Sequence, residues 1–269
     1  MGKSWFDLVL EKSRYVKRII ARLDVKSNFL IKGVRFEGLR KIGDPASTAL
    51  KYYEDGIDEI FLVDNVASLY GRNHLGSLLE KVAKDVFVPL TVAGGIRNLS
   101  DAEELFGLGA DKIGVNTASF SNPKLITDIA NKFGSQAVVG SIQAQRFSGG
   151  WECLVEQGRD RTGVAVVDRI KQLIELGVGE LLVTSVDNDG VQRGFDVQLA
   201  DVAAATSTVP VVIGGGCGGI DDALRVIKIE KLSGLSLGSA LHFGKIVIEE
   251  LKAKMKEESQ DLVLDEDRA

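Results

Sequence analysis

The stretch Gly56-Ile57-Asp58-Glu59-Ile60-Phe61-Leu62-Val63-Asp64 recurs in similar form as Gly177-Val178-Gly179-Glu180-Leu181-Leu182-Val183-Thr184-Ser185, which begins 121 residues later. A second run, Pro89-Leu90-Thr91-Val92-Ala93-Gly94-Gly95, recurs at the same offset as Pro210-Val211-Val212-Ile213-Gly214-Gly215-Gly216. Because this constant offset is close to half of the 269 residues, it indicates two similar halves. Each run is short, apolar and closed by glycine or a polar residue, as strands are.

Short apolar runs alternate with longer segments of helical periodicity along the whole chain. Eight strand-then-helix units in about 240 residues favour an α/β fold, a (β/α)₈ TIM barrel of two half-barrels, with a doubly wound sheet as the alternative. Helices are expected between the strands, among them 44–55, 99–108, 123–133, 165–176 and 220–228. The predicted strands are Arg18–Asp24, Glu59–Asp64, Val88–Ala93, Lys112–Asn116, Ala137–Gln143, Glu180–Ser185, Val211–Gly214 and Leu235–Gly238.

The composition supports one large globular domain. Hydrophobic residues make up 45% and charged residues 26%, and no run of 18 apolar residues occurs, which excludes a disordered chain and a membrane-spanning helix. A formal charge of −5 makes nucleic acid an improbable partner. We expect an amphipathic N-terminal extension at residues 1–15, a single barrel at residues 16–256 and an acidic C-terminal tail at residues 257–269.

Few side chains are available for metal or disulfide chemistry. Cys153 and Cys217 lie far apart, which disfavours a disulfide framework or zinc knuckle and suits a reducing cytoplasm. Only His74 and His242 supply imidazole, so a multi-histidine metal site is impossible. We therefore predict no metal and no cofactor.

Glycine-ended strands predict two phosphate sites. Gly95 and Gly216 each close an apolar strand before a helix, where backbone N–H groups can approach an anion. Asn116-Thr117 and Gly238-Ser239 follow one unit later in each half, and adjacent strand ends of this kind form the phosphate site of many barrels. The alternative is that the glycines only serve tight turns. Their twofold repetition favours a long substrate phosphorylated at both ends and lying across the barrel mouth.

Asp24 ends the first predicted strand, and barrel enzymes place catalytic groups at the carboxyl ends of strands. It is a candidate general acid or base, with an N-cap or turn aspartate as the alternative. The repeat puts Gln143 at the matching end of the fifth strand, 119 residues on. An amide can hold a substrate but cannot exchange a proton at useful pH, so only one of the two expected acid/base groups is present.

Two further polar groups follow strands. Asp189-Gly190 comes after the sixth strand and is either a ligand-facing turn or a solvated acidic loop. Lys32 lies in the long first loop, residues 26–43, whose glycines and positive charges suit a loop that covers phosphate. An ordinary exposed lysine is the alternative.

Four charged residues are expected near the barrel bottom. Arg18, Lys112 and Glu180 begin strands one, four and six, each an even number of residues before the strand end, so each points inward. Glu59 begins strand two. The two cations and two anions form either a mutually paired ring at the axis or unpaired charges on solvated strand ends.

Together these residues resemble the cyclase subunit of imidazole glycerol phosphate synthase. The resemblance covers residues 16–251. It is carried by Arg18-Ile19-Ile20-Ala21-Arg22-Leu23-Asp24-Val25-Lys26, Ile31-Lys32-Gly33, Gly43-Asp44-Pro45, Gly94-Gly95-Ile96-Arg97, Gly109-Ala110-Asp111-Lys112, Asn116-Thr117, Phe133-Gly134-Ser135-Gln136, Thr162-Gly163, Thr184-Ser185, Asp189-Gly190 and His242-Phe243.

The resemblance implies a barrel that receives ammonia from a class-I glutaminase docked on its bottom face, as a heterodimer with Asp111 near the contact. The ammonia passes Arg18, Glu59, Lys112 and Glu180 as a gate. At the top it helps convert a bisphosphorylated ribulosyl-formimino-aminoimidazole carboxamide nucleotide into imidazole glycerol phosphate and aminoimidazole carboxamide ribotide, a step of histidine biosynthesis. The expected substrate and phosphate residues are Lys32, Asp64, Gly95, Asn116, Thr117, Thr184, Asp189, Gly190, Gly216, Gly238 and Ser239.

Two departures fall on the chemical centre. The family uses two aspartates for acid/base work, and Asp24 matches the first while Gln143 stands at the second. Arg22 stands where the family usually has a small cysteine, and its guanidinium needs a partner, for which Asp24 and Asp64 are nearest. Residues 37–45 and 67–73 look like relatives associated with amidation of surface-polysaccharide sugars. A divergent paralogue is therefore expected, either an enzyme subunit or a noncatalytic scaffold that conducts ammonia to a sugar amidotransferase.

Overall fold

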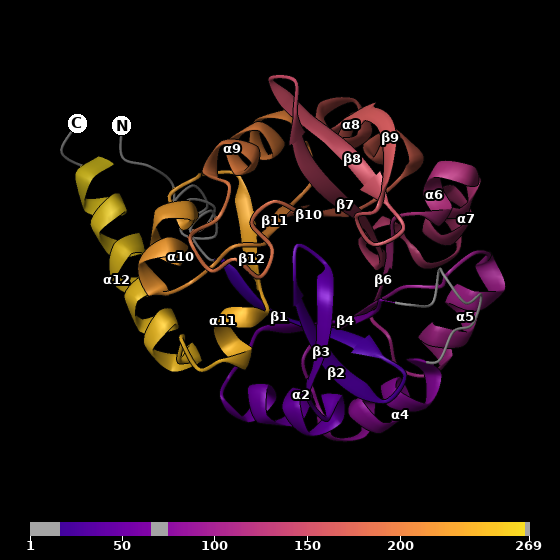
Figure 1. Ribbon diagram of the computed structural model, residues 1–269, viewed down its shortest axis with the longest axis horizontal. Helices are drawn as coiled ribbons and strands as arrows, with labels where there is room; N and C mark the ends of the chain where they lie inside the picture. The colour runs from indigo at the N-terminus through magenta and orange to yellow at the C-terminus, as the bar shows by residue number, and fades with distance from the viewer. Residues whose placement is uncertain (1–16, 66–74, 267–269) are drawn as a thin grey trace, which may run out of the picture.

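The computed structural model describes residues 17–65 and 75–266. Predictions for the N-terminal extension, for His74 and for the segment 67–73 lie outside the described residues. Eight parallel strands close into a barrel surrounded by helices (Figure 1), because the first strand pairs with the last. The predicted (β/α)₈ barrel is confirmed, and the closure rules out an open doubly wound sheet. The barrel strands are, in order around the axis, β1 (Arg18–Lys26), β4 (Glu59–Asp64), β5 (Leu90–Ala93), β6 (Lys112–Val115), β7 (Val138–Phe147), β10 (Glu180–Ser185), β11 (Val211–Gly214) and β12 (Leu232–Leu237).

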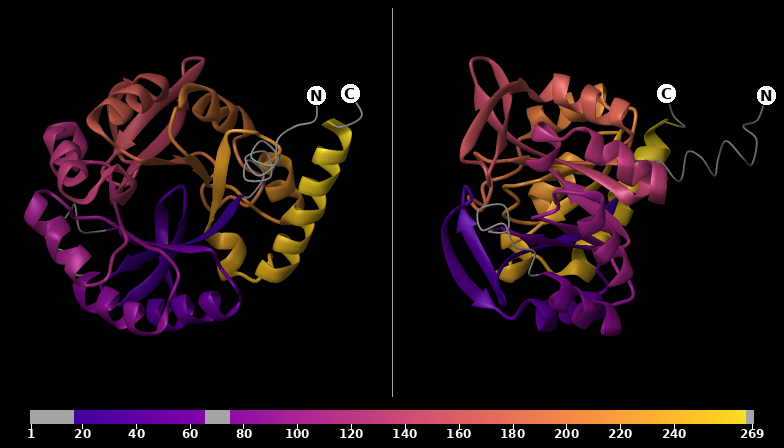
Figure 2. Two further views of the ribbon diagram at one scale, coloured as in Figure 1. Left: turned by 180° about the vertical axis from the view of Figure 1, so that it is seen from behind. Right: turned by 90° about the vertical axis from the view of Figure 1, so that its right-hand side faces the viewer.

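Two hairpins extend the barrel at its carboxyl-terminal end. β2 (Phe29–Val34) and β3 (Glu37–Gly43) follow β1, while β8 (Gly150–Val155) and β9 (Asp160–Ala165) follow β7. Both project from the same end of the barrel in the right-hand view of Figure 2. β2 and β8 begin 121 residues apart, so the hairpins belong to the internal repeat. The expectation of a loop at residues 26–43 is wrong, since most of this segment is strand.

The helices cover the outside of the barrel. Their apolar faces and the outward side chains of the strands form the main core, to which Leu23, Leu62, Ile113, Leu181 and Leu235 each contribute a side chain no more than 1% exposed. Among the described residues no helix is long and apolar enough to cross a membrane. The helices are α2 (Pro45–Glu54), α4 (Leu75–Asp85), α5 (Leu99–Gly107), α6 (Ala118–Ser121), α7 (Lys124–Phe133), the 3₁₀ turn η1 (Ser135–Ala137), α8 (Val166–Leu176), α9 (Val197–Thr206), α10 (Ile220–Ile227), α11 (Ser239–His242) and α12 (Ile248–Glu266).

The barrel interior is filled in layers. Alternate residues of β1 point inward, so that Arg18, Ile20, Arg22 and Asp24 lie at successive heights along the axis. A second apolar cluster fills the middle of the barrel and separates the charges at the bottom from those at the mouth. It consists of Ile20, Phe61, Val63, Ala93, Val139, Leu182 and Val212.

Candidate functional site

The four charged residues at the barrel bottom form one closed set of ion pairs. Arg18 Nη1 lies 2.8 Å from Glu59 Oε2, and Arg18 Nη2 pairs with Glu180 Oε1. Lys112 Nζ lies 3.0 Å from Glu59 and 2.8 Å from Glu180. Each carboxylate therefore contacts both cations, and the ring carries no net charge.

Asp111 also lies at this end of the barrel. Its carboxylate accepts a hydrogen bond from the Leu90 backbone N–H at 2.8 Å, and its own N–H donates to the Leu90 carbonyl at 2.8 Å. Asp111 is exposed. It is fixed to the start of β5 yet open to the solvent beneath the barrel.

A buried charge network occupies the centre of the mouth. Arg22 Nε donates to Asp24 Oδ1 at 2.9 Å, and Lys32 Nζ lies 3.2 Å from Asp24 Oδ2. Lys32 also contacts both oxygens of Asp189 at 3.0 Å. The four side chains are at most 7% exposed, and their formal charges cancel. Of the two partners expected for Arg22, Asp24 and Asp64, the ion pair is with Asp24. The alternative view of Lys32 as an ordinary exposed lysine is wrong, because Lys32 is buried in β2.

This network fixes the protonation state of Asp24. Burial would raise the pKa of Asp24, but Arg22 and Lys32 together hold the pKa well below its usual range. Burial opposes the charge of Lys32 in the same way, and Asp24 and Asp189 nevertheless raise the pKa of Lys32. Asp24 is therefore an ionised carboxylate whose two oxygens are each bound to a cation.

His242 supports Arg22 from outside the barrel, and sequence reasoning assigned it no role in the site. Its Nε2–H donates to the Arg22 carbonyl at 3.1 Å, so Nδ1 accepts from the Tyr52 hydroxyl at 2.8 Å. Burial lowers the pKa of His242 to about 4. A neutral imidazole thus fixes the backbone at the Arg22 position.

Gln143 lies on β7, the strand opposite β1 in the barrel, and its side chain lines the same cavity as Arg22. Gln143 is 5% exposed, and its side-chain oxygen Oε1 is buried without a hydrogen-bond partner among the described residues. Thr184 on β10 is the register partner of Gln143, and its hydroxyl lies 3.5 Å from Arg22 Nη1. Asp64 is buried at the end of β4.

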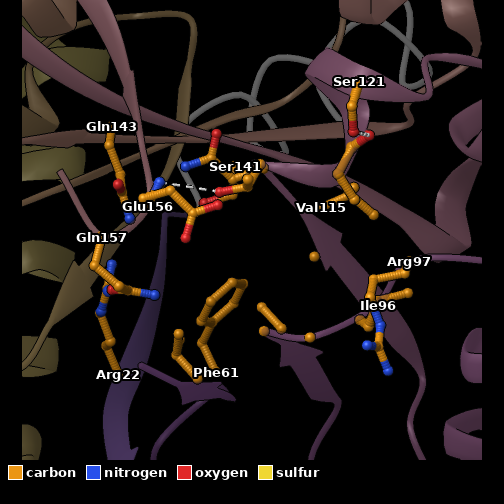
Figure 3. Close-up of a pocket in the computed structure, with 18 residues that line it drawn as sticks. Arg22, Phe61, Ile96, Arg97, Val115, Ser121, Ser141, Gln143, Glu156 and Gln157 are labelled. Carbon is orange, nitrogen blue, oxygen red and sulfur yellow. Dashed lines mark hydrogen bonds between the residues drawn. The ribbon is translucent and has the colours of Figure 1, made fainter. Parts of the chain in front are cut away.

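A cavity of about 240 Å³ opens beside this centre, in the N-terminal half of the barrel. Gly95, Asn116 and Thr117, here called the N-terminal cup, line it together with Arg22 and Gln143. Figure 3 shows Gln143, Gln157 and Arg22 on one side of the cavity and Arg97 on the other. The structure therefore brings the first predicted set of phosphate residues to one cavity wall.

The matching residues of the second half line a smaller cavity of about 20 Å³. Gly216, Gly238 and Ser239, here called the C-terminal cup, meet Asp189 and Gly190 there. The second predicted set is thus also brought together, and the acidic turn after β10 joins it.

The two cups are separated by the hairpins. Phe36 from the β2–β3 turn packs with Leu154 of β8 and with Val186 after β10. The Phe36 ring lies 5.3 Å from the Arg22 guanidinium carbon. The two hairpins therefore meet over the Arg22 side chain.

The turn between β8 and β9 supplies cavity residues that sequence reasoning missed. Glu156 and Gln157 adopt left-handed backbone conformations, with φ of 47° and 61°, and both line the N-terminal cavity. The Glu156 N–H donates to Thr117 Oγ1 at 3.1 Å, and Gln157 Oε1 is buried without a partner among the described residues. The sequence signal that could have found this turn is the 121-residue repeat. Gly158, directly after Gln157, lies 121 residues after Glu37, where β3 begins, so the turn between β8 and β9 repeats the turn between β2 and β3.

Comparisons with known proteins cover most of the chain. A family model described as "Histidine biosynthesis protein" matches residues 18–247. The imidazole glycerol phosphate synthase subunit HisF of Legionella pneumophila is 48% identical over 206 residues, which are 76% of this chain and 97% of that protein. The HisF subunit of Leuconostoc mesenteroides subsp. mesenteroides is 41% identical over 248 residues, 91% of this chain and 98% of the relative. That of Lactococcus lactis subsp. cremoris is 38% identical over 241 residues, 89% and 93% of the two chains.

Proposed function

The chain belongs to the histidine biosynthesis family and, within it, to the HisF subunits of imidazole glycerol phosphate synthase, and we propose that it is the ammonia-accepting cyclase subunit of a glutamine-dependent amidotransferase. Its substrate is the bisphosphorylated ribulosyl-formimino-aminoimidazole carboxamide nucleotide. With ammonia this gives imidazole glycerol phosphate and aminoimidazole carboxamide ribotide. The partner is a class-I glutaminase.

The observation that supports this proposal is that the Asp24 network reaches both cups, because Arg22 lines the N-terminal cavity and Asp189 lines the C-terminal one. The N-terminal cup and the C-terminal cup lie on either side of the mouth, and each presents glycine-ended strand termini to a cavity. A molecule with one phosphate in each cup lays its middle over Asp24. Thr184, Asp64 and the Asp189-Gly190 turn then contact the middle of the substrate, and Lys32 links Asp24 to Asp189.

The axis of the barrel supplies the second reactant in this proposal. The glutaminase docks at the bottom, beside Asp111, and the ring of Arg18, Glu59, Lys112 and Glu180 acts as the gate for ammonia. Next to the ring, a void of about 10 Å³ is lined by Glu59 and Glu180 of the ring and by Ile20, Phe61 and Leu182 of the apolar layer. Phe61 also lines the N-terminal cavity, so the void and the cavity share one wall.

A second candidate function follows from the Arg22–Asp24 pair and Gln143. Asp24 is held ionised by two cations and Gln143 cannot exchange a proton, so the mouth lacks a free acid/base pair. This chemistry favours a divergent paralogue that conducts ammonia from the glutaminase to a separate protein, and the resemblance of residues 37–45 and 67–73 suggests a sugar amidotransferase of surface-polysaccharide biosynthesis as that protein.

The experiment that separates the two functions is turnover of the histidine-pathway nucleotide by the purified protein in ammonium salts. Because general acid or base help contributes about 10²–10⁴-fold, loss of one of two groups predicts turnover slower than that of an ordinary cyclase by that order. Turnover at an ordinary rate supports histidine biosynthesis and overturns the scaffold. Absence of a complex with the glutaminase encoded beside it, in pull-down and size-exclusion experiments, overturns both functions.

The cups are tested separately by crystals soaked in millimolar phosphate. We expect ordered phosphate at Gly95, Asn116 and Thr117, and at Gly216, Gly238 and Ser239. Two empty cups would remove the basis for a bisphosphorylated substrate.

A further inference from the structure

The structure contains a buried cation far from the charge networks described above. Arg169 on α8 is 2% exposed and forms no ion pair within residues 17–65 and 75–266. Its Nη2 donates to Ser119 Oγ and its Nη1 to Gln172 Oε1 at 2.5 Å, while the guanidinium carbon lies 3.8 Å from the centre of the Phe120 ring. A guanidinium stays charged at neutral pH, so α8 carries a buried positive charge that is not ion-paired to any carboxylate among the described residues.

A buried charge without a counter-charge is costly. Two of the three contacts of Arg169 are with α6, which directly follows the Asn116-Thr117 segment of the N-terminal cup. Ser119 Oγ in turn donates to the Asn116 carbonyl at 2.6 Å. Two consecutive hydrogen bonds therefore join Arg169 to the wall of the cavity.

The cavity shows an independent sign of a ligand. Gln143 is nineteen-twentieths buried, lines the cavity, and has an amide oxygen without a partner within the described structure. Figure 3 shows its side chain at the cavity wall beside Arg22 and Gln157. A buried polar atom of this kind is satisfied when a ligand or water fills the cavity.

The repeat provides a comparison inside the same molecule. α11 begins 121 residues after α6 and follows the C-terminal cup as α6 follows the N-terminal cup. The contact behind α11 is the hydrogen bond between Tyr52 of α2 and His242. A neutral imidazole thus lies behind the C-terminal cup, where a charged guanidinium lies behind the N-terminal cup.

We propose that Arg169 is a positioning residue that gives the N-terminal cup a higher affinity for anions than the C-terminal cup has. The N-terminal cup is then the site where a phosphoryl group of the substrate binds first. Arg169 holds the Asn116-Thr117 segment in place through Ser119 and adds a positive charge behind the cup, to which a bound anion is attracted. This inference rests on the proposed function, which supplies the two cups. At an effective dielectric constant of about 20, one unit charge near a bound anion changes its affinity on the order of tenfold.

The test is a titration of the isotope-labelled full chain with inorganic phosphate, followed by NMR. The backbone amides of Gly95 and Thr117 report on one cup, and those of Gly216 and Ser239 report on the other. We expect the N-terminal cup to saturate at a roughly tenfold lower phosphate concentration. Arg169→Gln should remove most of this preference, and Arg169→Lys, which keeps the charge, should retain a large part of it.

The matched control is Lys171→Gln, which removes the same charge from an exposed position two residues along α8. Leu173→Ala controls for packing, because it truncates a buried core residue of the same helix. Both should leave the ratio of the two affinities unchanged. Three results would each overturn the role of Arg169 alone. They are saturation of the C-terminal cup before the N-terminal cup, an unchanged ratio of the two affinities in Arg169→Gln, or an equal change of this ratio in either control. Failure of all four amides to respond overturns the cups and this inference with them.

Discussion

At the residue scale, the chemistry of the mouth depends on what Arg22 does to Asp24. The guanidinium occupies one carboxylate oxygen at 2.9 Å, and Lys32 occupies the other at 3.2 Å. A carboxylate in this state is a poor proton acceptor, because protonation would leave the buried Arg22 without a carboxylate partner and Lys32 with only Asp189. Gln143, which lines the same cavity as Arg22, offers no proton either.

We expect Gln143→Asp to recover only part of the cyclase activity, because Arg22 still holds Asp24. The double variant Gln143→Asp/Arg22→Cys should recover more than the two single variants combined, since neighbouring groups couple. Steady-state turnover of the histidine-pathway nucleotide with ammonium measures this. Gln143→Asn, which shortens the side chain without adding a carboxylate, is the control. Strictly additive single effects would show that Arg22 does not restrain Asp24.

The titration of His242 makes the free energy of unfolding depend on pH. Burial lowers its pKa from 6.5 to about 4, so between these values the unfolded chain binds a proton that the folded chain does not. The free energy of unfolding therefore rises with pH across this window, and the His242 contribution is fully present only above about pH 6.5. Asp24 acts at lower pH, because its pKa is depressed below the ordinary 3.8.

The variant His242→Phe keeps the ring stacked on Tyr52 but cannot titrate. We expect urea unfolding at pH 7.5, 5.5 and 4.5 to show a steeper loss of stability in the wild type than in His242→Phe. Parallel loss in the two proteins would mean that the imidazole is protonated in the folded state as readily as in the unfolded one.

Sequence reasoning found some of these residues and missed others for a physical reason. Arg22 and Asp24 lie on one face of one strand, so their pairing follows from the period of two residues. The contacts of His242 with Tyr52 and of Arg169 with Ser119 join helices that are 190 and 50 residues apart along the chain. No local pattern marks such contacts, because helix packing decides them.

At the element scale, the eight barrel strands were predictable and the two hairpins were not. Barrel strands are buried on both faces, so each reads as a continuous apolar run. In β3 and β9 no residue is buried, and glycines and charges alternate with partly buried side chains. The 121-residue offset relates the two hairpins. It could have predicted one hairpin from the other only if the sequence pattern of one of them had already been read as a hairpin.

Gly190 holds the first hairpin against the barrel. Its φ is +72°, and a Cβ there would lie 2.3 Å from the Gly33 backbone oxygen, so Gly190→Ala must displace β2. Gly38 has a similar φ of +61° with nothing within 4 Å of its Cβ position, so Gly38→Ala isolates the backbone cost, about 1 kcal/mol. We expect Gly190→Ala to lose more stability in urea and to speed amide exchange in β2 and β3. Equal behaviour of the two variants would count against this anchoring role.

At the scale of the whole molecule, the ring and the cups lie at opposite ends of the barrel with the apolar layer between them. Lys112→Glu leaves Arg18 as the only cation facing three carboxylates. In the complex with the glutaminase, we expect it to lower turnover driven by glutamine more than turnover driven by ammonium, with phosphate affinity at the cups unchanged. Lys124→Glu, an exposed charge reversal on α7, should change neither ratio. An equal fall in both kinds of turnover would place the effect at the mouth or on overall folding.

The pairing of β1 with β12 also has a consequence for folding while the chain is being synthesised. Lys17, just before β1, donates to the Leu232 carbonyl across a separation of 215 residues, and Arg18 is in register with Gly234. At a synthesis rate of about 5–20 residues per second, β1 waits on the order of ten to forty seconds for its last neighbour. During that interval one edge of an apolar strand is open to any other nascent chain.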